Sequence, residues 1–227
     1  MSLYTIILIA SISIAFSLSF DNKVQFYKQW KYLLPSVVAI ALFYIVGDIY
    51  FTKTGVWGFN REYLSGVYLL YLPIEEWIFF IAIPYASIFL HDVLHAYFPK
   101  FQLPSNVSRR LTIFFFAIAL VVLLLNLDKA YTVYIMVVSL IVLVIAYFDW
   151  TDTISRFYCT FLVILIPFIL VNGALTGTFT PNPVVWYDHT QNLDIRLITI
   201  PIEDFAYGFT MLLLAIMLRN RLKKVEG

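Results

Sequence analysis

Long apolar segments separated by short polar stretches follow one another along almost the whole chain. Each segment is close to the roughly 20 residues that a helix needs to cross a bilayer core about 30 Å thick. The segments fall at residues 2–20, 33–51, 67–90, 110–127, 130–148, 157–176 and 197–218. The pattern therefore predicts an all-α integral membrane protein with seven transmembrane helices.

The composition supports a membrane protein and excludes several other classes. The chain is 62% hydrophobic, carries charge on 13% of its positions and has a net charge of +1, which is far from the average of soluble domains. It has no basic stripe, phosphate-binding loop or dinucleotide motif, so we expect neither nucleic acid nor a nucleotide cofactor. The first 20 residues lack a cationic segment and a small-residue cleavage site, which favours an uncleaved anchor.

The basic residues predict the orientation in the membrane. With the N-terminus outside, eleven of the 15 lysines and arginines lie on the cytoplasmic side. These are Lys23, Lys28, Lys31, Lys100, Arg109, Arg110, Arg156, Arg219, Arg221, Lys223 and Lys224. The four on the outer side are Lys53, Arg61, Lys129 and Arg196. Because cytoplasmic loops carry the excess of basic residues, we expect a multi-pass protein of the cytoplasmic membrane with its N-terminus out and its C-terminus in.

The two halves of the chain repeat one pattern. The first copy is Phe43-Tyr-Ile-Val-Gly-Asp48, then Trp57, then Leu72-Pro-Ile-Glu-Glu76, and the second is Phe168-Ile-Leu-Val-Asn-Gly173, then Trp186, then Ile200-Pro-Ile-Glu-Asp204. In both copies a helix ends near a polar residue, a turn-rich loop follows, and the next helix opens with Pro-Ile-Glu-acid. We expect two parallel three-helix repeats, 1–98 and 130–227, joined by a connector helix in 99–129.

The repeat brings polar side chains to one level of the membrane. Asp48 and Asn172 are expected to end outward-running helices, and two acid pairs open inward-running ones: Glu75 with Glu76 and Glu203 with Asp204. A charged side chain at mid-bilayer costs about 2.5–3.5 kcal/mol, so a shared central cavity is the expected reason for four acids. Adjacent helical residues point about 100° apart, so one acid of each pair should face the cavity while its neighbour braces another helix. The alternative is a solvated position at the outer headgroups.

At these residues the sequence resembles the small integral-membrane lycopene cyclases, a carotenoid cyclase family of two-subunit or fused proteins. The family is marked by Pro-x-Glu-(Glu/Asp) in each half, matched here by Pro73-Ile-Glu-Glu76 and Pro201-Ile-Glu-Asp204. The resemblance covers nearly the whole chain and implies the fused form. It implies lycopene as substrate, with the lipid bilayer and other membrane enzymes of the carotenoid pathway as partners. The implied reaction is a redox-neutral cyclisation of carotene ends without a cofactor.

That reaction adds a proton to a terminal alkene, closes the ring on the resulting cation and removes a proton. Glu75 and Glu203 are our leading proton-transfer candidates, with Glu76 and Asp204 as polarising or bracing partners. Aromatic faces stabilise a cation without attacking it, and Asp48 and Asn172 either orient the acids or cap helix ends. The substrate-binding candidates are Asp48, Asn172, Trp77, Phe80, Phe205 and Tyr207. Trp57 and Trp186 are equally well explained as residues of the outer aromatic belt.

Other functions would need further residues beside the acids. An intramembrane metalloprotease would combine Glu75 and Glu76 with His91 and His95, but about 24 Å of helix separates Glu75 from His91. We therefore expect no metal site, and a solvated cluster of His91, Asp92 and His95. A prenyltransferase would need an Asp-rich array and basic partners, which the sequence lacks. A proton-coupled transporter or carotenoid-binding membrane protein stays open, and it predicts unchanged pigments in a lycopene-accumulating bacterium.

Overall fold

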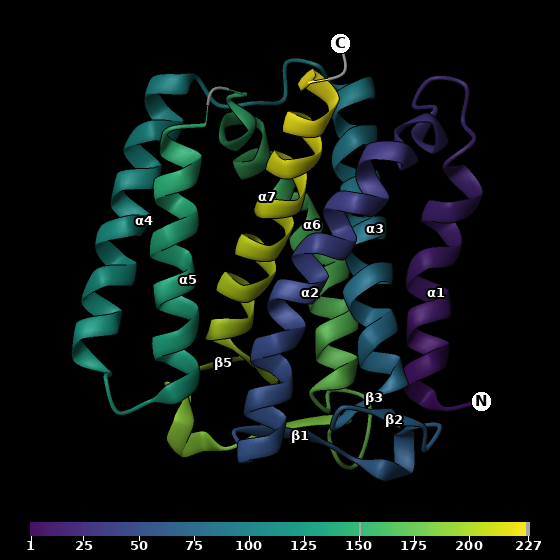
Figure 1. Ribbon diagram of the computed structural model, residues 1–227, viewed down its shortest axis with the longest axis vertical. Helices are drawn as coiled ribbons and strands as arrows, with labels where there is room; N and C mark the ends of the chain where they lie inside the picture. Colours follow the sequence, from purple (N-terminus) through teal and green to yellow (C-terminus); the bar gives the residue numbers. More distant parts are fainter. Residues whose placement is uncertain (150, 226–227) are drawn as a thin grey trace.

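A computed structural model describes residues 1–149 and 151–225, and these residues form a bundle of seven α-helices (Figure 1). The helices are α1 (Leu3–Leu18), α2 (Trp30–Thr54), α3 (Ile74–Tyr97), α4 (Ser105–Leu125), α5 (Ala130–Tyr147), α6 (Thr153–Leu175) and α7 (Ile202–Val225). The short strands are β1 (Trp57–Phe59), β2 (Tyr68–Leu69), β3 (Leu72–Pro73), β4 (Val185–Tyr187), β5 (Arg196–Leu197) and β6 (Ile200–Pro201). The predicted all-α fold with seven helices is confirmed.

Helix length and composition agree with a membrane protein. Five helices, α2 to α6, are long and apolar enough to cross a bilayer. Helix α1 is apolar but only 16 residues long, and α7 has 24 residues with acidic side chains in its first turn and basic ones in its last. The chain is therefore a multi-pass membrane protein whose first and last helices are less typical than the central five.

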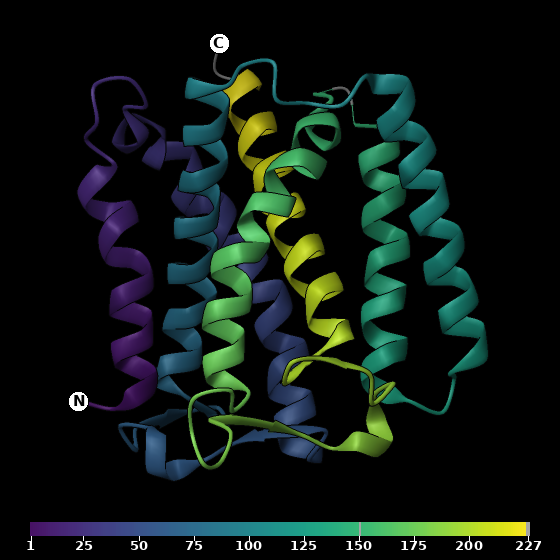
Figure 2. The same cartoon turned by 180° about the vertical axis from the view of Figure 1, so that it is seen from behind.

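Successive helices run in opposite directions, so the molecule has two distinct ends. All six strands lie at one end together with the N-terminus, and the C-terminus lies at the other (Figure 1). We call these the strand end and the opposite end; the charge pattern predicts that the strand end faces outward. Helix α1 packs on α3 at one edge, α4 packs on α5 at the other, and α7 packs against α2 and α5 between them (Figures 1 and 2). Tyr44, Phe80 and Phe157 belong to the core between these helices and are at most 1% exposed.

Two of the predicted spans begin too early. Residues 67–73 and 197–201 were expected to be helical, but they form the β2–β3 and β5–β6 hairpins, and α3 and α7 begin after them at Ile74 and Ile202. The turn of the first hairpin requires positive φ at Leu70 (48°) and Tyr71 (73°), and the second requires it at Ile198 (61°). Large apolar residues rarely adopt this conformation, so no turn was expected here. Their hydrophobicity instead continued the apolar pattern that predicted a helix.

The two halves meet through an antiparallel pair of strands. Strand β1 pairs with β4 so that Gly58 lies opposite Trp186. A Cβ atom at Gly58 would lie 2.3 Å from the Trp186 ring, so a larger residue here would have to displace that ring. On either side, the Asn60 amide donates to the Val184 carbonyl and the Asp188 amide donates to the Val56 carbonyl, both at 2.8 Å. Along the sequence, Asn60 is as far from Asp188, and Val56 as far from Val184, as Glu75 is from Glu203.

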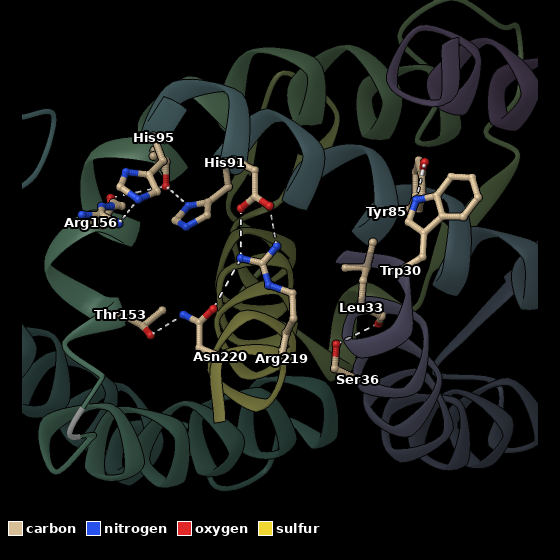
Figure 3. Close-up of polar contacts among 12 residues, drawn as sticks. Trp30, Leu33, Ser36, Tyr85, His91, His95, Thr153, Arg156, Arg219 and Asn220 are labelled. Atoms are coloured by element: carbon tan, nitrogen blue, oxygen red, sulfur yellow. Dashed lines mark hydrogen bonds and ion pairs between the residues drawn. The ribbon is translucent and has the colours of Figure 1, made fainter. Parts of the chain in front are cut away.

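At the opposite end, polar side chains join α3, α6 and α7 (Figure 3). Arg219 of α7 donates to both carboxylate oxygens of Asp92 of α3 at 2.7 and 2.9 Å. His91 Nδ1 lies 2.7 Å from Thr160 Oγ1, and His95 Nε2 lies 2.7 Å from Arg156 of α6. His91 is buried, so the expected solvated cluster is wrong for this residue. These contacts fix α3 relative to α6 and α7 at the end away from the acid pairs.

Candidate functional site

A cavity of about 300 Å³ lies between α1, α3, α6 and α7, a volume at the lower end of the range of small-molecule sites. Most of its wall is apolar and aromatic, and carboxyl groups reach it towards the strand end. Strands β1 and β4 contribute Trp57, Phe59, Val185 and Tyr187 to its wall. Side chains from both halves of the chain therefore line one common cavity.

The first carboxyl group in the cavity wall is that of Glu76. Pro73 has an extended backbone and directly precedes α3, so Glu76 falls in the first turn of that helix. Its side chain is 7% exposed, and its Oε2 accepts a hydrogen bond from the Tyr4 hydroxyl at 2.6 Å. A short bond of this kind holds the carboxyl group in one orientation towards the cavity.

The second carboxyl group is that of Asp204, in the first turn of α7. It accepts two tyrosine hydroxyl bonds, from Tyr131 at 2.6 Å and from Tyr187 at 2.9 Å. Tyr187 lies in β4, where burial and the neighbouring Asp204 raise the pKa of its hydroxyl well above the usual value. The Tyr187 hydroxyl therefore remains protonated and acts as a hydrogen-bond donor to Asp204.

The other acid of each pair is turned away from the cavity and holds a loop. Glu75 Oε1 accepts from the Ser65 amide at 2.6 Å and from the Ser2 hydroxyl at 2.8 Å. Glu203 Oε1 accepts from the Leu193 amide and the Thr132 hydroxyl, both at 2.7 Å. These glutamates are 1% and 0% exposed, so the alternative of solvated acids at the headgroups is wrong.

The acid pairs therefore divide as the helix period requires, with one member at the cavity and one bracing its surroundings. The order within each pair differs from the expectation. Glu75 and Glu203 were the leading candidates for proton transfer, but the cavity-lining acids are Glu76 and Asp204. The period fixes the angle between neighbouring side chains, whereas packing against α1 and α5 decides which one faces inward.

Asp48 and Asn172 both line the cavity, but only Asn172 lies at the end of its helix as expected. Asp48 precedes the end of α2 at Thr54 by more than one turn, and Asn172 lies in the last turn of α6. Asp48 is buried, and its Oδ2 has no hydrogen-bond partner among the described residues. Asn172 donates to the Phe168 carbonyl of its own helix at 3.1 Å. Asp48 thus adds a third carboxyl group to the cavity.

Of the four aromatic substrate-binding candidates, two line the cavity and two do not. Phe80 and Tyr207 line the cavity. Trp77 instead donates to the Leu69 carbonyl of the hairpin at 3.2 Å, and Phe205 packs on Phe168 with ring centroids 5.1 Å apart. Trp57, which the sequence explained equally well as a belt residue, lines the cavity and is 5% exposed.

Sequence reasoning missed the tyrosines that hold the acids. Tyr4 and Tyr131 lie in the first turns of α1 and α5, the first helix of each half, and each is followed by a threonine. Thr132 bonds Glu203 as described, and Thr5 lies 3.4 Å from Glu75. The repeated Tyr-Thr pair was therefore a usable signal, which a longer alignment of the two halves would have found.

Comparison with known proteins gives the family. A family model described as Lycopene cyclase matches residues 1–94 and 128–222. The chain belongs to the lycopene cyclase family. The two matched ranges contain α1–α3 and α5–α7 and leave α4 between them. Neither the curated proteins nor the solved structures contain a match.

Membership in the lycopene cyclase family indicates the general activity of the chain. The family implies a carotene cyclase that acts on a carotenoid in a lipid environment, and a mostly apolar cavity with acids at one end fits a hydrocarbon substrate. Among the described residues, no group of three or more His, Cys, Asp or Glu side chains is placed to hold a metal ion.

Proposed function

We propose that this lycopene cyclase converts the ends of an acyclic carotene, with lycopene as the expected substrate, into β-type ionone rings by proton transfer within the cavity. The observation that carries the proposal is the presence of Asp48, Glu76 and Asp204 in the wall of one mostly apolar cavity. Acids from both halves reach this space, and two of them are held by tyrosine hydroxyl groups. An apolar substrate therefore meets oriented proton donors and acceptors without bulk water.

The reaction balances without an oxidant or a reductant. A carboxylic acid delivers a proton to the terminal carbon–carbon double bond and leaves a tertiary carbocation. A neighbouring double bond of the same chain attacks this cation, which forms the ring bond and moves the positive charge into the ring. A carboxylate then removes a proton from a carbon beside the charge, and a ring double bond forms. The product is an isomer of the substrate, so the scheme needs no cofactor.

Glu76 and Asp204 carry the proton-transfer roles in this proposal, because they are the cavity-lining members of the two acid pairs. Glu75 and Glu203, also predicted catalytic, serve as loop anchors through their amide and hydroxyl donors. Phe80, Tyr207 and Trp57 offer aromatic faces to the cation, an interaction of about 0.5–2 kcal/mol that adds no nucleophile.

The wider organisation is part of the same proposal. Residues 1–98 and 130–227 act as two equivalent units, each supplying one acid pair, and residues 99–129 join them as in a fused two-subunit enzyme. The repeated hydrogen bonds of the acid pairs and the two matched ranges support this division. The protein resides in the cytoplasmic membrane, where other membrane enzymes of the carotenoid pathway are its expected neighbours.

Expression in a lycopene-accumulating bacterium tests the proposed function. The wild-type chain should yield pigments with rings. Glu76→Gln should lower cyclisation by about 10²–10⁴-fold, the usual contribution of a positioned acid or base, and Asp204→Asn should lower it by about 10–100-fold. Glu62→Gln is the control, because Glu62 is an exposed acid in a loop at the strand end. Unchanged lycopene with wild-type protein present in the membrane would contradict the proposal and favour a transporter or binding protein. Full cyclisation by both variants would exclude these carboxyl groups.

A further inference from the structure

The cavity does not end at the acids but continues along one face of α3. Its lining includes Phe79, Ile83, Ala86, Ser87 and Leu90. These residues follow one another at intervals of three or four positions, except for the neighbours Ala86 and Ser87. They therefore lie on one face of the helix. Phe79, Ile83, Ala86, Ser87 and Leu90 are half-buried although α3 lies inside the bundle. The stripe is therefore the floor of a groove.

The groove is long compared with the membrane. From Glu76 to Leu90 the helix rises about 21 Å at 1.5 Å per residue, which is about two thirds of a 30 Å hydrocarbon core. A rod-shaped chain lying on this floor would stand roughly along the membrane normal. One end of the rod would meet Glu76, and the other would reach the level of Leu90, towards the opposite end of the bundle.

Helices α1 and α6 form the walls of the groove. Helix α1 contributes Ser11, Ile14 and Ala15, and α6 contributes Pro167, Phe168 and Val171. In Figure 2, α6 lies in front of α3 with α1 at its side. Ile14 is 70% exposed and Pro167 is also exposed, so the rim of the groove lies at the outer surface of the bundle. In a membrane that surface is in contact with lipid.

The groove selects for a hydrocarbon. Beyond the acids its lining contains no charged side chain among the described residues. Along α1 and α3 the lining hydroxyl groups beyond the acids are those of Ser11 and Ser87, and the Ser11 hydroxyl already donates to the Ile7 carbonyl at 2.7 Å. At the strand end the paired β1 and β4 close the cavity with Trp57 and Tyr187. The groove is thus open to lipid along its side, and it is closed and polar at its strand end, where the acids lie.

We infer that this groove binds the polyene chain of the substrate lengthwise against α3, with the reacting end group at the acids and with access from the lipid between α1 and α6. The inference rests on the proposed function and adds the binding mode. It follows that the length of the groove determines how long a substrate chain can bind. A side chain that fills the groove far from the acids should obstruct long chains and spare short ones with the same end group.

A matched pair of variants on α1 tests the position of the groove. Ser11 lines it, whereas Ser13 is exposed on the other side of the same helix, and both hydroxyl groups bond to a carbonyl one turn earlier. Ser11→Phe should lower the conversion of lycopene in proteoliposomes by at least about tenfold, and Ser13→Phe should leave it near the wild-type rate. Equal conversion by Ser11→Phe and wild type, at equal protein levels, would overturn the inference.

Ser87→Phe, at the far part of the groove, tests the chain-length argument. We expect this variant to lose lycopene conversion while it still cyclises a truncated acyclic carotenoid that has the same end group. Equal loss of both substrates, or retention of both, would overturn the inference; if Ser87→Phe does not accumulate, Leu90→Trp serves the same test. A wild-type chain that cyclises neither substrate would instead show that the proposed function fails.

Discussion

The two halves of the molecule build nearly the same acid site, and they differ where the chemistry is expected to differ. Glu76 and Asp204 each accept a hydrogen bond from a tyrosine of the first helix of their half, both at 2.6 Å. Asp204 accepts a second bond from Tyr187. With the spacing that separates Glu75 from Glu203, the position equivalent to Tyr187 is Phe59, which has no hydroxyl group.

The first half carries a different addition. Asp48 lines the cavity near Glu76. The repeated motif matches Asp48 with Asn172, and the spacing of Glu75 and Glu203 matches it with Thr176; neither residue has a carboxyl group. Hydroxyl donors stabilise a carboxylate, whereas a second carboxyl group nearby disfavours a second negative charge. We propose a division of labour that the symmetric sequence motif conceals: Glu76, beside Asp48, delivers the proton, and Asp204, held by two hydroxyl groups, removes one.

The largest effect should follow the loss of the proton donor. Glu76→Gln should lower ring formation by about 10²–10⁴-fold, because no cation forms without the first proton. In membranes suspended in D₂O, the lycopene recovered from this variant should contain no deuterium, while rings made by the wild type carry one deuterium at each closed end. Deuterated rings from Glu76→Gln at the wild-type rate would remove Glu76 from the donor role.

Loss of the proton acceptor should change the products as well as the rate. In Asp204→Asn the cation still forms, but it has to lose a proton from another carbon or capture water. We expect a fall of about 10–100-fold and a mixture of ring-isomer and hydroxylated products, each with deuterium when formed in D₂O. Chromatography with mass spectrometry measures both. If Asp204→Asn gave no rings and no deuterium, as expected of Glu76→Gln, the two roles would have to be exchanged.

The third test removes the carboxyl group that has no counterpart in the second half. Asp48→Asn keeps the size of the side chain but removes its charge, and the proposed division of labour predicts about a tenfold lower rate of proton delivery, equivalent to about 1.4 kcal/mol. Asp48→Glu retains a carboxyl group and should keep more activity. Initial rates in proteoliposomes give both values. Wild-type rates for Asp48→Asn would show that Glu76 works without it.

The sequence predicted the membrane fold and the meeting of the two acid pairs, because hydropathy and a repeated motif are local properties. It placed the starts of α3 and α7 too early, since Leu70, Tyr71 and Ile198 are apolar residues in tight turns. It named Glu75 and Glu203 as the leading proton-transfer candidates, whereas the acids in the cavity wall are Glu76 and Asp204. The rotation of a helix about its own axis depends on what packs against it, and here Tyr4 and Tyr131 set it from distant parts of the chain.

The smallest effect expected comes from the hydroxyl group that distinguishes the two acid sites. Tyr187→Phe removes one of two donors to Asp204, and a hydrogen bond to a charged group contributes about 1.5–3 kcal/mol. The remaining Tyr131 bond should absorb part of that loss, so we expect a rate lowered by about 3–10-fold with the same ring product.

The reciprocal variant Phe59→Tyr is the matched control, because it adds a hydroxyl group on the Glu76 side. If Asp204 depends on its second donor, the double variant Tyr187→Phe/Phe59→Tyr should be slower than Tyr187→Phe alone. The added hydroxyl group would favour the charged form of Glu76, the acid that has to deliver the proton. Restoration of the wild-type rate by the double variant would show instead that the cavity needs the hydroxyl group on either side, and that the two acids are interchangeable.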